Sequence, residues 1–168
     1  MAPANKRVFI TATSYGPNFA ATAGTSDGLA GADGICAIAA SAASLGGKWK
    51  AWLSNSVTSA IDRINEVGPW YRLDGQEAFT GKANLASVPL VTLSITEQGT
   101  ASTAAAVWTG TQNGGTASTS CEWGNDPNHL NVLLTSGIGS GTSTSDWTAA
   151  GTRKCDGSVT LPLYCFEQ

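Results

Sequence analysis

The sequence LAGADGICAIAASAASLGGKWKAWLS, at residues 29–54, predicts a long helix followed by a buried strand. Its first part is dense in alanine, and its larger apolar residues recur at spacings of three and four, as on one face of a helix. Asp33 lies near the expected start, where the positive end of the helix dipole favours a carboxylate, and Gly46 and Gly47 would end the helix. We therefore expect the main helix over residues 29–45.

The second part of this segment, residues 48–54, has the alternation of a strand. Successive side chains of a strand point to opposite faces, so Trp49 and Leu53 fall on one face and Trp52 on the other. Large apolar side chains on both faces predict a strand that is covered on both sides.

Four cysteines, Cys36, Cys121, Cys155 and Cys165, favour two disulfides over a metal site. No Cys-x-x-Cys pair is present, and such pairs are typical of structural zinc sites. Three pairings are possible, and the sequence does not fix which one forms. The nested pairing, Cys36 with Cys165 and Cys121 with Cys155, encloses a short loop and ties the last strand to an early helix. Disulfides in turn predict an oxidising compartment.

Length and composition favour one exported domain. The 168 residues are 42% hydrophobic, enough to build one core, and only 12% charged. The net charge of −3 and the lack of a basic cluster argue against a nucleic-acid partner. No apolar run approaches the roughly 18 residues of a membrane span, so we expect no membrane insertion. Residues 1–7 lack the apolar stretch of a signal peptide. We expect them to be an arm or stalk remnant, residues 8–168 to be a single domain, and the export signal to lie outside this sequence.

Further elements follow from local patterns. We expect a first strand over residues 8–13, a short helix over residues 58–65, and a strand over residues 70–74 that runs into an Asp-Gly turn. The second half is expected to be rich in β-structure, with strand pieces at residues 105–109, 121–123, 146–148 and 161–166. The low-complexity stretch over residues 133–145 predicts a long loop.

Three blocks of sequence resemble a known family: GADGIC at residues 31–36, LGGKWKAWLS at residues 45–54, and LYCFE at residues 163–167. They are similar to the endostatin-like branch of the C-type lectin-like superfamily, and more closely to a poorly characterised bacterial domain family found in exported proteins. The resemblance covers residues 8–167. It implies an α+β fold with two helices packed on a twisted antiparallel sheet, paired terminal strands and the nested disulfides.

Relative to the sugar-binding members of that superfamily, this chain lacks the residues of the usual calcium site. Those members carry a Glu-Pro-Asn or Gln-Pro-Asp triplet before the third cysteine and Trp-Asn-Asp before the fourth, which supply oxygen ligands. Here residues 109–120 contain no carboxylate, and Asp146-Trp147-Thr148 keeps the tryptophan without the Asn-Asp pair. The comparison implies that the usual calcium site is absent, and we expect no metal or other cofactor.

The stretch EWGNDPNH, which begins at Glu122, is the first candidate for a ligand-binding site because it concentrates carboxylates, amides, a tryptophan and the only histidine. The ring of Trp123 could stack on a sugar while amides and carboxylates bind its hydroxyls, or the oxygens of the stretch could bind a metal ion. The competing interpretation is a tight turn with the tryptophan buried, since Asn, Asp, Pro and Gly are turn residues. The candidate binding residues in this stretch are Trp123, Asn125, Asp126, Asn128 and His129.

Trp70 and Tyr71 are a second candidate binding surface, whereas the other tryptophans, Trp49, Trp52, Trp108 and Trp147, are expected in the core. The Ser/Thr/Gly-rich loops at residues 110–120 and 133–145 could form an adaptable recognition surface or be simple solvated loops.

No nucleophile motif, zinc-protease motif or phosphate-binding glycine loop is present, so we expect no enzyme. The predicted function is a non-enzymatic extracellular recognition or adhesion module, on a bacterial surface or secreted protein, that binds glycan or protein without the usual calcium site. The alternative is a structural tip or trimerisation domain that caps a surface fibre.

Overall fold

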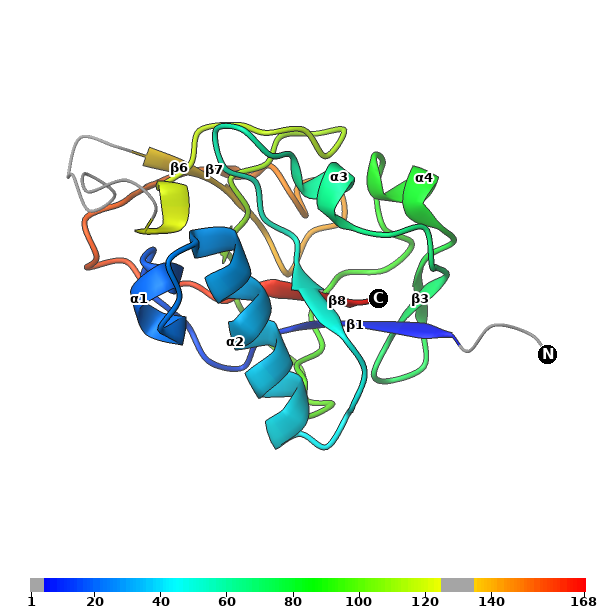
Figure 1. Ribbon diagram of the computed structural model, residues 1–168. Coiled ribbons are helices and arrows are strands. Elements are labelled where there is room, and N and C mark those ends of the chain that lie inside the picture. The colour runs from blue at the N-terminus through cyan, green and yellow to red at the C-terminus, as the bar shows by residue number, and fades with distance from the viewer. Residues whose placement is uncertain (1–4, 125–134) are drawn as a thin grey trace.

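The structure, a computed structural model, describes residues 5–124 and 135–168 (Figure 1). Within these ranges the chain is a mixed α+β structure with two sheets. The helices are α1 (Phe19–Ala23), α2 (Gly28–Ala42), α3 (Ala60–Arg63), α4 (Lys82–Leu85) and the 3-10 turn η1 (Glu122–Gly124). The strands are β1 (Lys6–Ile10), β2 (Trp49–Ala51), β3 (Trp70–Arg72), β4 (Glu77–Phe79), β5 (Val107–Trp108), β6 (Thr135–Gly139), β7 (Gly151–Lys154) and β8 (Tyr164–Glu167).

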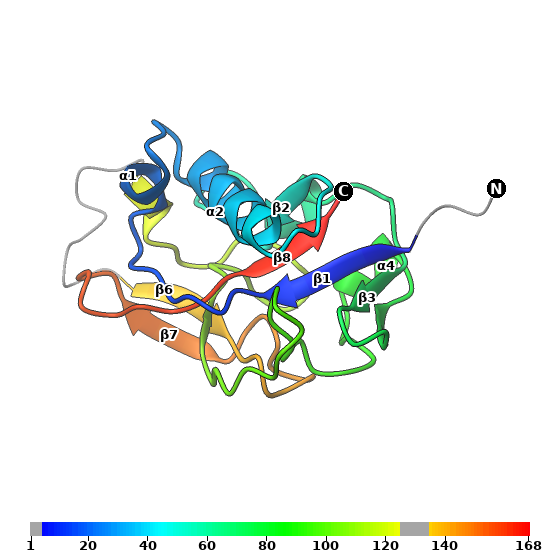
Figure 2. The same cartoon turned by 90° about the horizontal axis from the view of Figure 1, so that it is seen from below.

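The larger sheet has the strand order β2-β8-β1-β3-β4, and the smaller one has the order β5-β6-β7. Figure 2 shows α1 and α2 on one side of the larger sheet, with β6 and β7 on the other. The first and last strands pair antiparallel, with Val8 opposite Phe166, as the family resemblance implied. The resemblance implied an antiparallel sheet, and this is wrong for one pair of strands, because β1 and β3 are parallel. A long crossover through α1, α2, β2 and α3 returns the chain in the same direction, which parallel pairing requires.

Helix α2 confirms the predicted main helix but differs at both ends. The N-cap is Asp27, whose carboxylate accepts hydrogen bonds from the N–H groups of Leu29 and Ala30, so Asp33 lies within the helix. The helix ends before the glycine pair, because Ser44 adopts the left-handed conformation at φ 57°. The Leu45 N–H then donates to the Ala40 carbonyl, which satisfies one of the last carbonyls of the helix.

Glycines let α2 approach its neighbours closely. A Cβ at Gly31 would lie 2.4 Å from the carbonyl oxygen of Phe19 in α1, and one at Gly28 would lie 2.4 Å from that of Trp123 in η1. No side chain fits at either distance. The helix is therefore packed backbone to backbone against α1 and η1.

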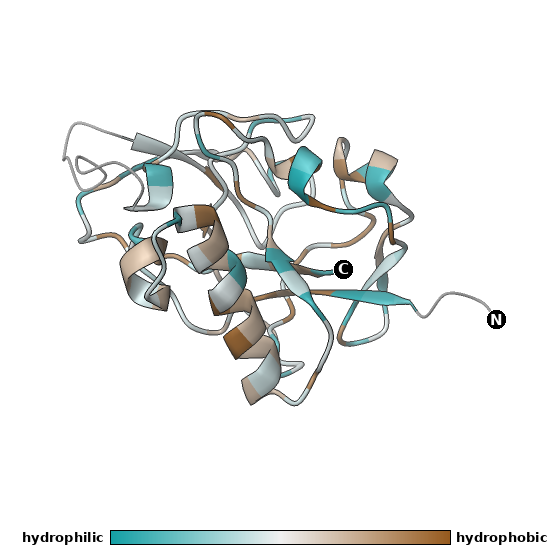
Figure 3. Cartoon of the chain, viewed as in Figure 1, coloured by the Kyte–Doolittle hydropathy of each residue, from teal (hydrophilic) through white to brown (hydrophobic). Residues whose placement is uncertain are grey.

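Two apolar clusters fill the core, one on each face of the larger sheet. Trp49 and Leu53 belong to the cluster that includes α2, and Trp52 belongs to the other, so the prediction of a strand covered on both sides is confirmed. All six tryptophans are 5% exposed or less. In Figure 3 many loop segments are nearly white, the colour of the near-neutral Gly, Ser and Thr residues that fill them.

Both disulfides have the nested pairing. Cys36 in α2 bonds to Cys165 in β8, and Cys121 before η1 bonds to Cys155 after β7, each with 5.5 Å between its Cα atoms. All four cysteines are buried. Disulfides of this kind indicate folding in an oxidising environment. Separately, no helix within the described ranges is long and apolar enough to cross a membrane.

Several boundaries differ from the sequence expectations. Lys6 and Arg7, which we had placed in the N-terminal arm, belong to β1 and pair with β3. Residues 121–123 enter a 3-10 turn rather than a strand, and residues 146–148 form no strand. The predicted loop over residues 133–145 instead contains β6, whose residues 136–139 are buried between β5 and β7. The other predicted strands and the short helix at residues 58–65 form within a few residues of their expected places.

The hydroxyl of Tyr164 is buried and has no hydrogen-bond partner among the described residues. The side chain lies in the aromatic core near Trp147, with ring centroids 5.9 Å apart. Burial raises the pKa of the Tyr164 phenol far above its usual value. Replacing Tyr164 with phenylalanine should therefore raise the free energy of unfolding by about 1 kcal/mol, because an unsatisfied buried hydroxyl is removed. Urea unfolding checks this, with Tyr71→Phe at a partly exposed position as the control that should change little; a destabilised Tyr164→Phe variant would contradict the expectation.

Candidate functional site

The structure buries Trp123, the centre of the first predicted binding site. Its indole N–H donates to the Ser54 carbonyl at 2.7 Å, and its ring stacks on Phe19 with centroids 5.1 Å apart. A fully buried ring offers no platform for a sugar, so this expectation is wrong and the alternative of a buried tryptophan is correct for this residue. The other candidates in the stretch, Asn125, Asp126, Asn128 and His129, lie outside the described residues.

The second predicted surface, Trp70 with Tyr71, is also mostly internal. Trp70 is fully buried, donates its indole N–H to the Glu167 carbonyl at 2.8 Å, and meets the ring of Phe166 edge to face. It anchors β3 to the C-terminal strand and is not a surface residue. Tyr71 points the other way from β3 and is partly exposed.

The loop over residues 110–120 is fastened to the scaffold. It closes a small hairpin through the Thr111–Ala117 bridge, and the Ala117 N–H donates to the Ser59 hydroxyl at 3.0 Å. Gly115 lies so close to α3 that a Cβ there would be 2.7 Å from the Cβ of Ile61. Any recognition by this loop would therefore use a preformed surface.

A hollow of about 350 Å³ combines apolar walls with a carboxylate. It lies where the C-terminal end of α2 approaches the turn after β3 and the hairpin around residues 95–101. We call it the Glu97 hollow. Its lining residues are Ala43, Leu45, Leu73, Glu97, Gln98 and Gly99.

Glu97 is held in place by the hairpin. The Gly99 N–H donates to the Thr96 carbonyl at 2.9 Å, which closes a tight turn with Glu97 and Gln98 at its centre. A residue at a turn tip is usually exposed, but Glu97 is only 8% exposed. Its Oε2 accepts a hydrogen bond from the Ala12 N–H at 2.8 Å, whereas its Oε1 has no hydrogen-bond partner among the described residues. One carboxylate oxygen of the hollow is thus unused within the described fold.

Sequence reasoning missed this site. The run Thr-Glu-Gln-Gly-Thr at residues 96–100 has the composition of a turn, and turn residues are usually exposed, so nothing in the run marks Glu97 as buried. The glutamate turns inward because Ala12, 85 residues earlier, offers it an N–H group. That contact depends on tertiary structure, and no local pattern reports it.

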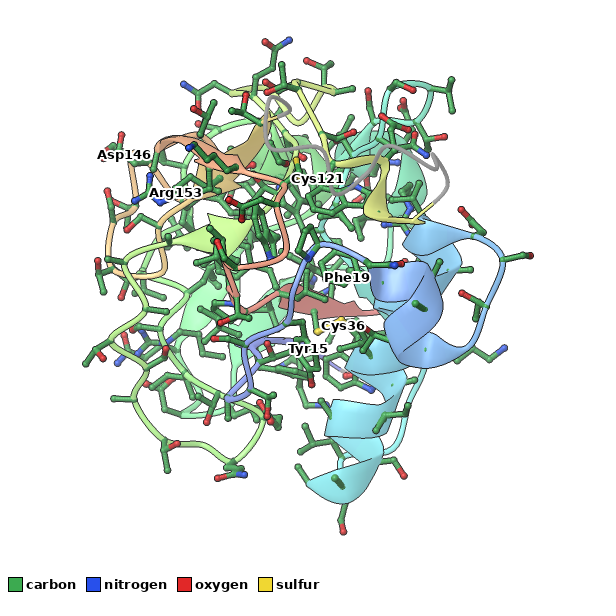
Figure 4. All side chains as sticks on the ribbon, turned by 90° about the vertical axis from the view of Figure 1, so that its left-hand side faces the viewer. Tyr15, Phe19, Cys36, Cys121, Asp146 and Arg153 are labelled. Carbon is green, nitrogen blue, oxygen red and sulfur yellow. A yellow bond between two sulfur atoms is a disulfide. The ribbon has the colours of Figure 1, made fainter. Side chains whose placement is uncertain are left out.

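The electrostatics of the hollow favour a positive charge. Helix α2 points its C-terminal end, the negative end of its dipole, toward the hollow and has no basic residue in its last turn. The charged residues on either side of Leu73, Arg72 and Asp74, form an ion pair with each other. Nearby, burial raises the pKa of the Tyr15 phenol, a contact with Thr13 opposes this shift, and the charge of Glu97 adds to it. Figure 4 shows Tyr15 close to Cys36, whose disulfide with Cys165 lies in the middle of the view.

Within residues 5–124 and 135–168, no group of three or more His, Cys, Asp or Glu side chains is placed to hold a metal ion. Glu97 is the only ionisable residue that lines the hollow, so the hollow itself offers one carboxylate and no second acid, base or nucleophile.

Comparison of the sequence with known protein families gives no match, and no curated protein matches it.

Proposed function

We propose that the chain is a non-enzymatic extracellular recognition module with a C-type lectin-like fold, which binds glycan or protein without the superfamily's usual calcium site. The sequence blocks at residues 31–36, 45–54 and 163–167 support the fold assignment. The nested disulfides and the antiparallel pairing of the terminal strands agree with it. Export of the chain is part of this proposal and is supported by the two disulfides.

The observation that carries the proposal is the Glu97 hollow. It combines apolar walls with a carboxylate oxygen that has no internal partner, and ligand sites typically join a mainly apolar concave surface to a few placed polar groups. A lone carboxylate suits binding better than catalysis, because acid–base and nucleophilic mechanisms need a second group within reach of the reacting atoms.

The placement of the termini supports presentation of a binding surface. The ammonium group of Lys6 donates to the carbonyl of Gln168 at 2.7 Å, so both ends of the described domain meet. Figure 1 shows this meeting point at one end of the molecule, with α1 and η1 at the opposite end. A domain attached through its termini would leave that opposite end and the face with the hollow free for contacts.

A binding screen tests the proposal. The purified oxidised protein is applied to a glycan array and to a panel of cell-surface proteins, once with calcium and once with a chelator. We expect binding to at least one ligand class, with an affinity that changes less than about twofold on chelation, because the carboxylates of the usual calcium site are missing.

Three results would contradict the proposal in different ways. Strong dependence on calcium would contradict the metal-free mode, and turnover of a bound glycan or peptide would contradict the non-enzymatic role. Light scattering that found a stable trimer without any ligand would favour the fibre-capping role instead.

A further inference from the structure

We propose that the Glu97 hollow binds a lysine or arginine side chain presented by a protein partner. The inference rests on the proposed recognition function and specifies the chemistry of the partner. The ligand group is an aliphatic cation, with its charged head at the Glu97 carboxylate and its stem against the apolar walls.

The carboxylate lacks an internal cation. The described residues form three ion pairs, Arg7–Glu167, Arg63–Asp33 and Arg72–Asp74, and none includes Glu97. Glu97 as a residue is only 8% exposed, and its Oε1 is not among the fully buried side-chain atoms, so this oxygen faces the open hollow. Oε2 receives the Ala12 N–H, and Oε1 is left for an external donor.

The end of α2 adds to the attraction for a cation. Ala43, the C-cap residue of this helix, lines the hollow, and no basic side chain in the last turn offsets the negative end of the helix dipole. Cations are favoured at helix C-termini for this reason. Two separate features of the fold, the carboxylate and the helix end, thus favour the same sign of charge.

The walls match the stem of the proposed side chain. Leu45 and Leu73 are partly buried, and each packs against the core cluster with its exposed part facing the hollow. Lysine and arginine cover apolar surface with their methylene groups while the charged head reaches a polar partner. A ligand without such a stem would leave this apolar wall in water.

A partner protein is favoured over a small free amine because the hollow is open to solvent on one side. An open site encloses little of a small molecule, so the loss of translational freedom on binding is poorly compensated. When the side chain belongs to a partner protein, the other contacts of the interface help to offset this loss of translational freedom. The net charge of −3 also draws a basic partner toward the chain.

A titration with three short peptides tests the inference. The probes are acetyl-Gly-Lys-Gly-amide, acetyl-Gly-Arg-Gly-amide, and the same peptide with norleucine, which keeps the stem without the charge. Backbone amide shifts in the NMR spectrum report where each peptide binds. Because an open site binds a short peptide weakly, each peptide is titrated to about 50 mM, which saturates a site with a millimolar dissociation constant. We expect saturable shifts at Ala12, Leu73 and Gly99 for the two charged peptides and none for norleucine.

Two variants of the hollow give opposite expected effects. Glu97→Gln keeps the size of the side chain and an acceptor for the Ala12 N–H, and should weaken binding at least about tenfold because the charged acceptor is lost. Gln98→Glu adds a carboxylate at the rim and should tighten binding about threefold, the scale of an exposed ion pair. Because a misfolded protein would not bind the peptides more tightly, this gain cannot arise from loss of structure.

Glu77→Gln is the matched control, since it makes the same change of charge in β4 and does not line the hollow. An equal loss in Glu77→Gln and Glu97→Gln would show general electrostatic attraction and overturn the site. Absence of peptide shifts in a protein that still binds a glycan or protein in the screen would overturn this inference and leave the proposed function standing.

Discussion

Replacing Cys36 and Cys165 together with alanine is expected to lower the free energy of unfolding by about 5 kcal/mol. The bond joins residues separated by 129 positions, so it removes many conformations from the unfolded chain. It also ties α2 to β8, the strand at the second position of the larger sheet. A loss of this size is comparable with the whole net stability of many domains, about 5–15 kcal/mol, so the variant should be partly unfolded at 37 °C.

The second disulfide is the comparison for this prediction. Cys121 and Cys155 are separated by 34 residues, and the same chain-entropy relation gives about 4 kcal/mol for their replacement with alanine. Urea unfolding of both double variants measures the difference. If the pair at 121 and 155 proves the more costly to remove, strain or local packing sets the contribution of these bonds rather than loop length.

The helix, the buried strand and the two disulfides could be predicted because each leaves a local mark in the sequence. Alternation at Trp49, Trp52 and Leu53 places side chains on both faces of β2, and the structure has a core on each of those faces. Four cysteines allow three pairings, and the family resemblance implied the one that the structure has.

Strand β6 could not be predicted because its sequence, TSGIG, has low strand propensity. Its position depends on contacts with distant backbone. A Cβ at Gly139 would lie 1.8 Å from the carbonyl oxygen of Trp147, so only glycine allows this approach. The glycines that made the segment look like a loop are what let its strand pack.

The candidate site shows the same limit. Trp123 stands in a run of turn residues, and its burial follows from the close approach of Gly28 in α2, 95 positions earlier. Glu97 is likewise a turn residue that is buried, and the N–H group of distant Ala12 holds its carboxylate inside. Composition identifies residues with binding chemistry, but tertiary contacts determine which of them are available.

Arg63 is the centre of a charged network that joins α2, β2 and α3. Its guanidinium donates to the carbonyls of Ala51 and Leu53 at 2.7 and 3.3 Å and to the Asp33 carboxylate at 2.7 Å. The same oxygen of Asp33 accepts the N–H of Ala51 at 2.9 Å. The Arg63 side chain is 9% exposed and that of Asp33 is 26% exposed. If these hydrogen bonds are broken, water can therefore reach few of the groups that lose their partners.

Replacing Arg63 with methionine should therefore lower the free energy of unfolding by about 3 kcal/mol, the lower end for breaking a buried pair because Asp33 keeps some contact with water. Adding Asp33→Asn to that variant should cost less than the same change in the native chain, since the two side chains are coupled. Thermal and urea unfolding of the four proteins gives this coupling energy.

Arg153→Met is the matched control for Arg63→Met. Arg153 lies on the exposed strand β7, and within the described residues its side chain donates only to the carbonyl of neighbouring Thr152, so its replacement should change stability by less than about 0.5 kcal/mol. If Arg63→Met were no more destabilising than this control, the network would be too well solvated to hold α2, β2 and α3 together. The Cys36–Cys165 bond and the apolar core would then be the features that fix α2 on the sheet.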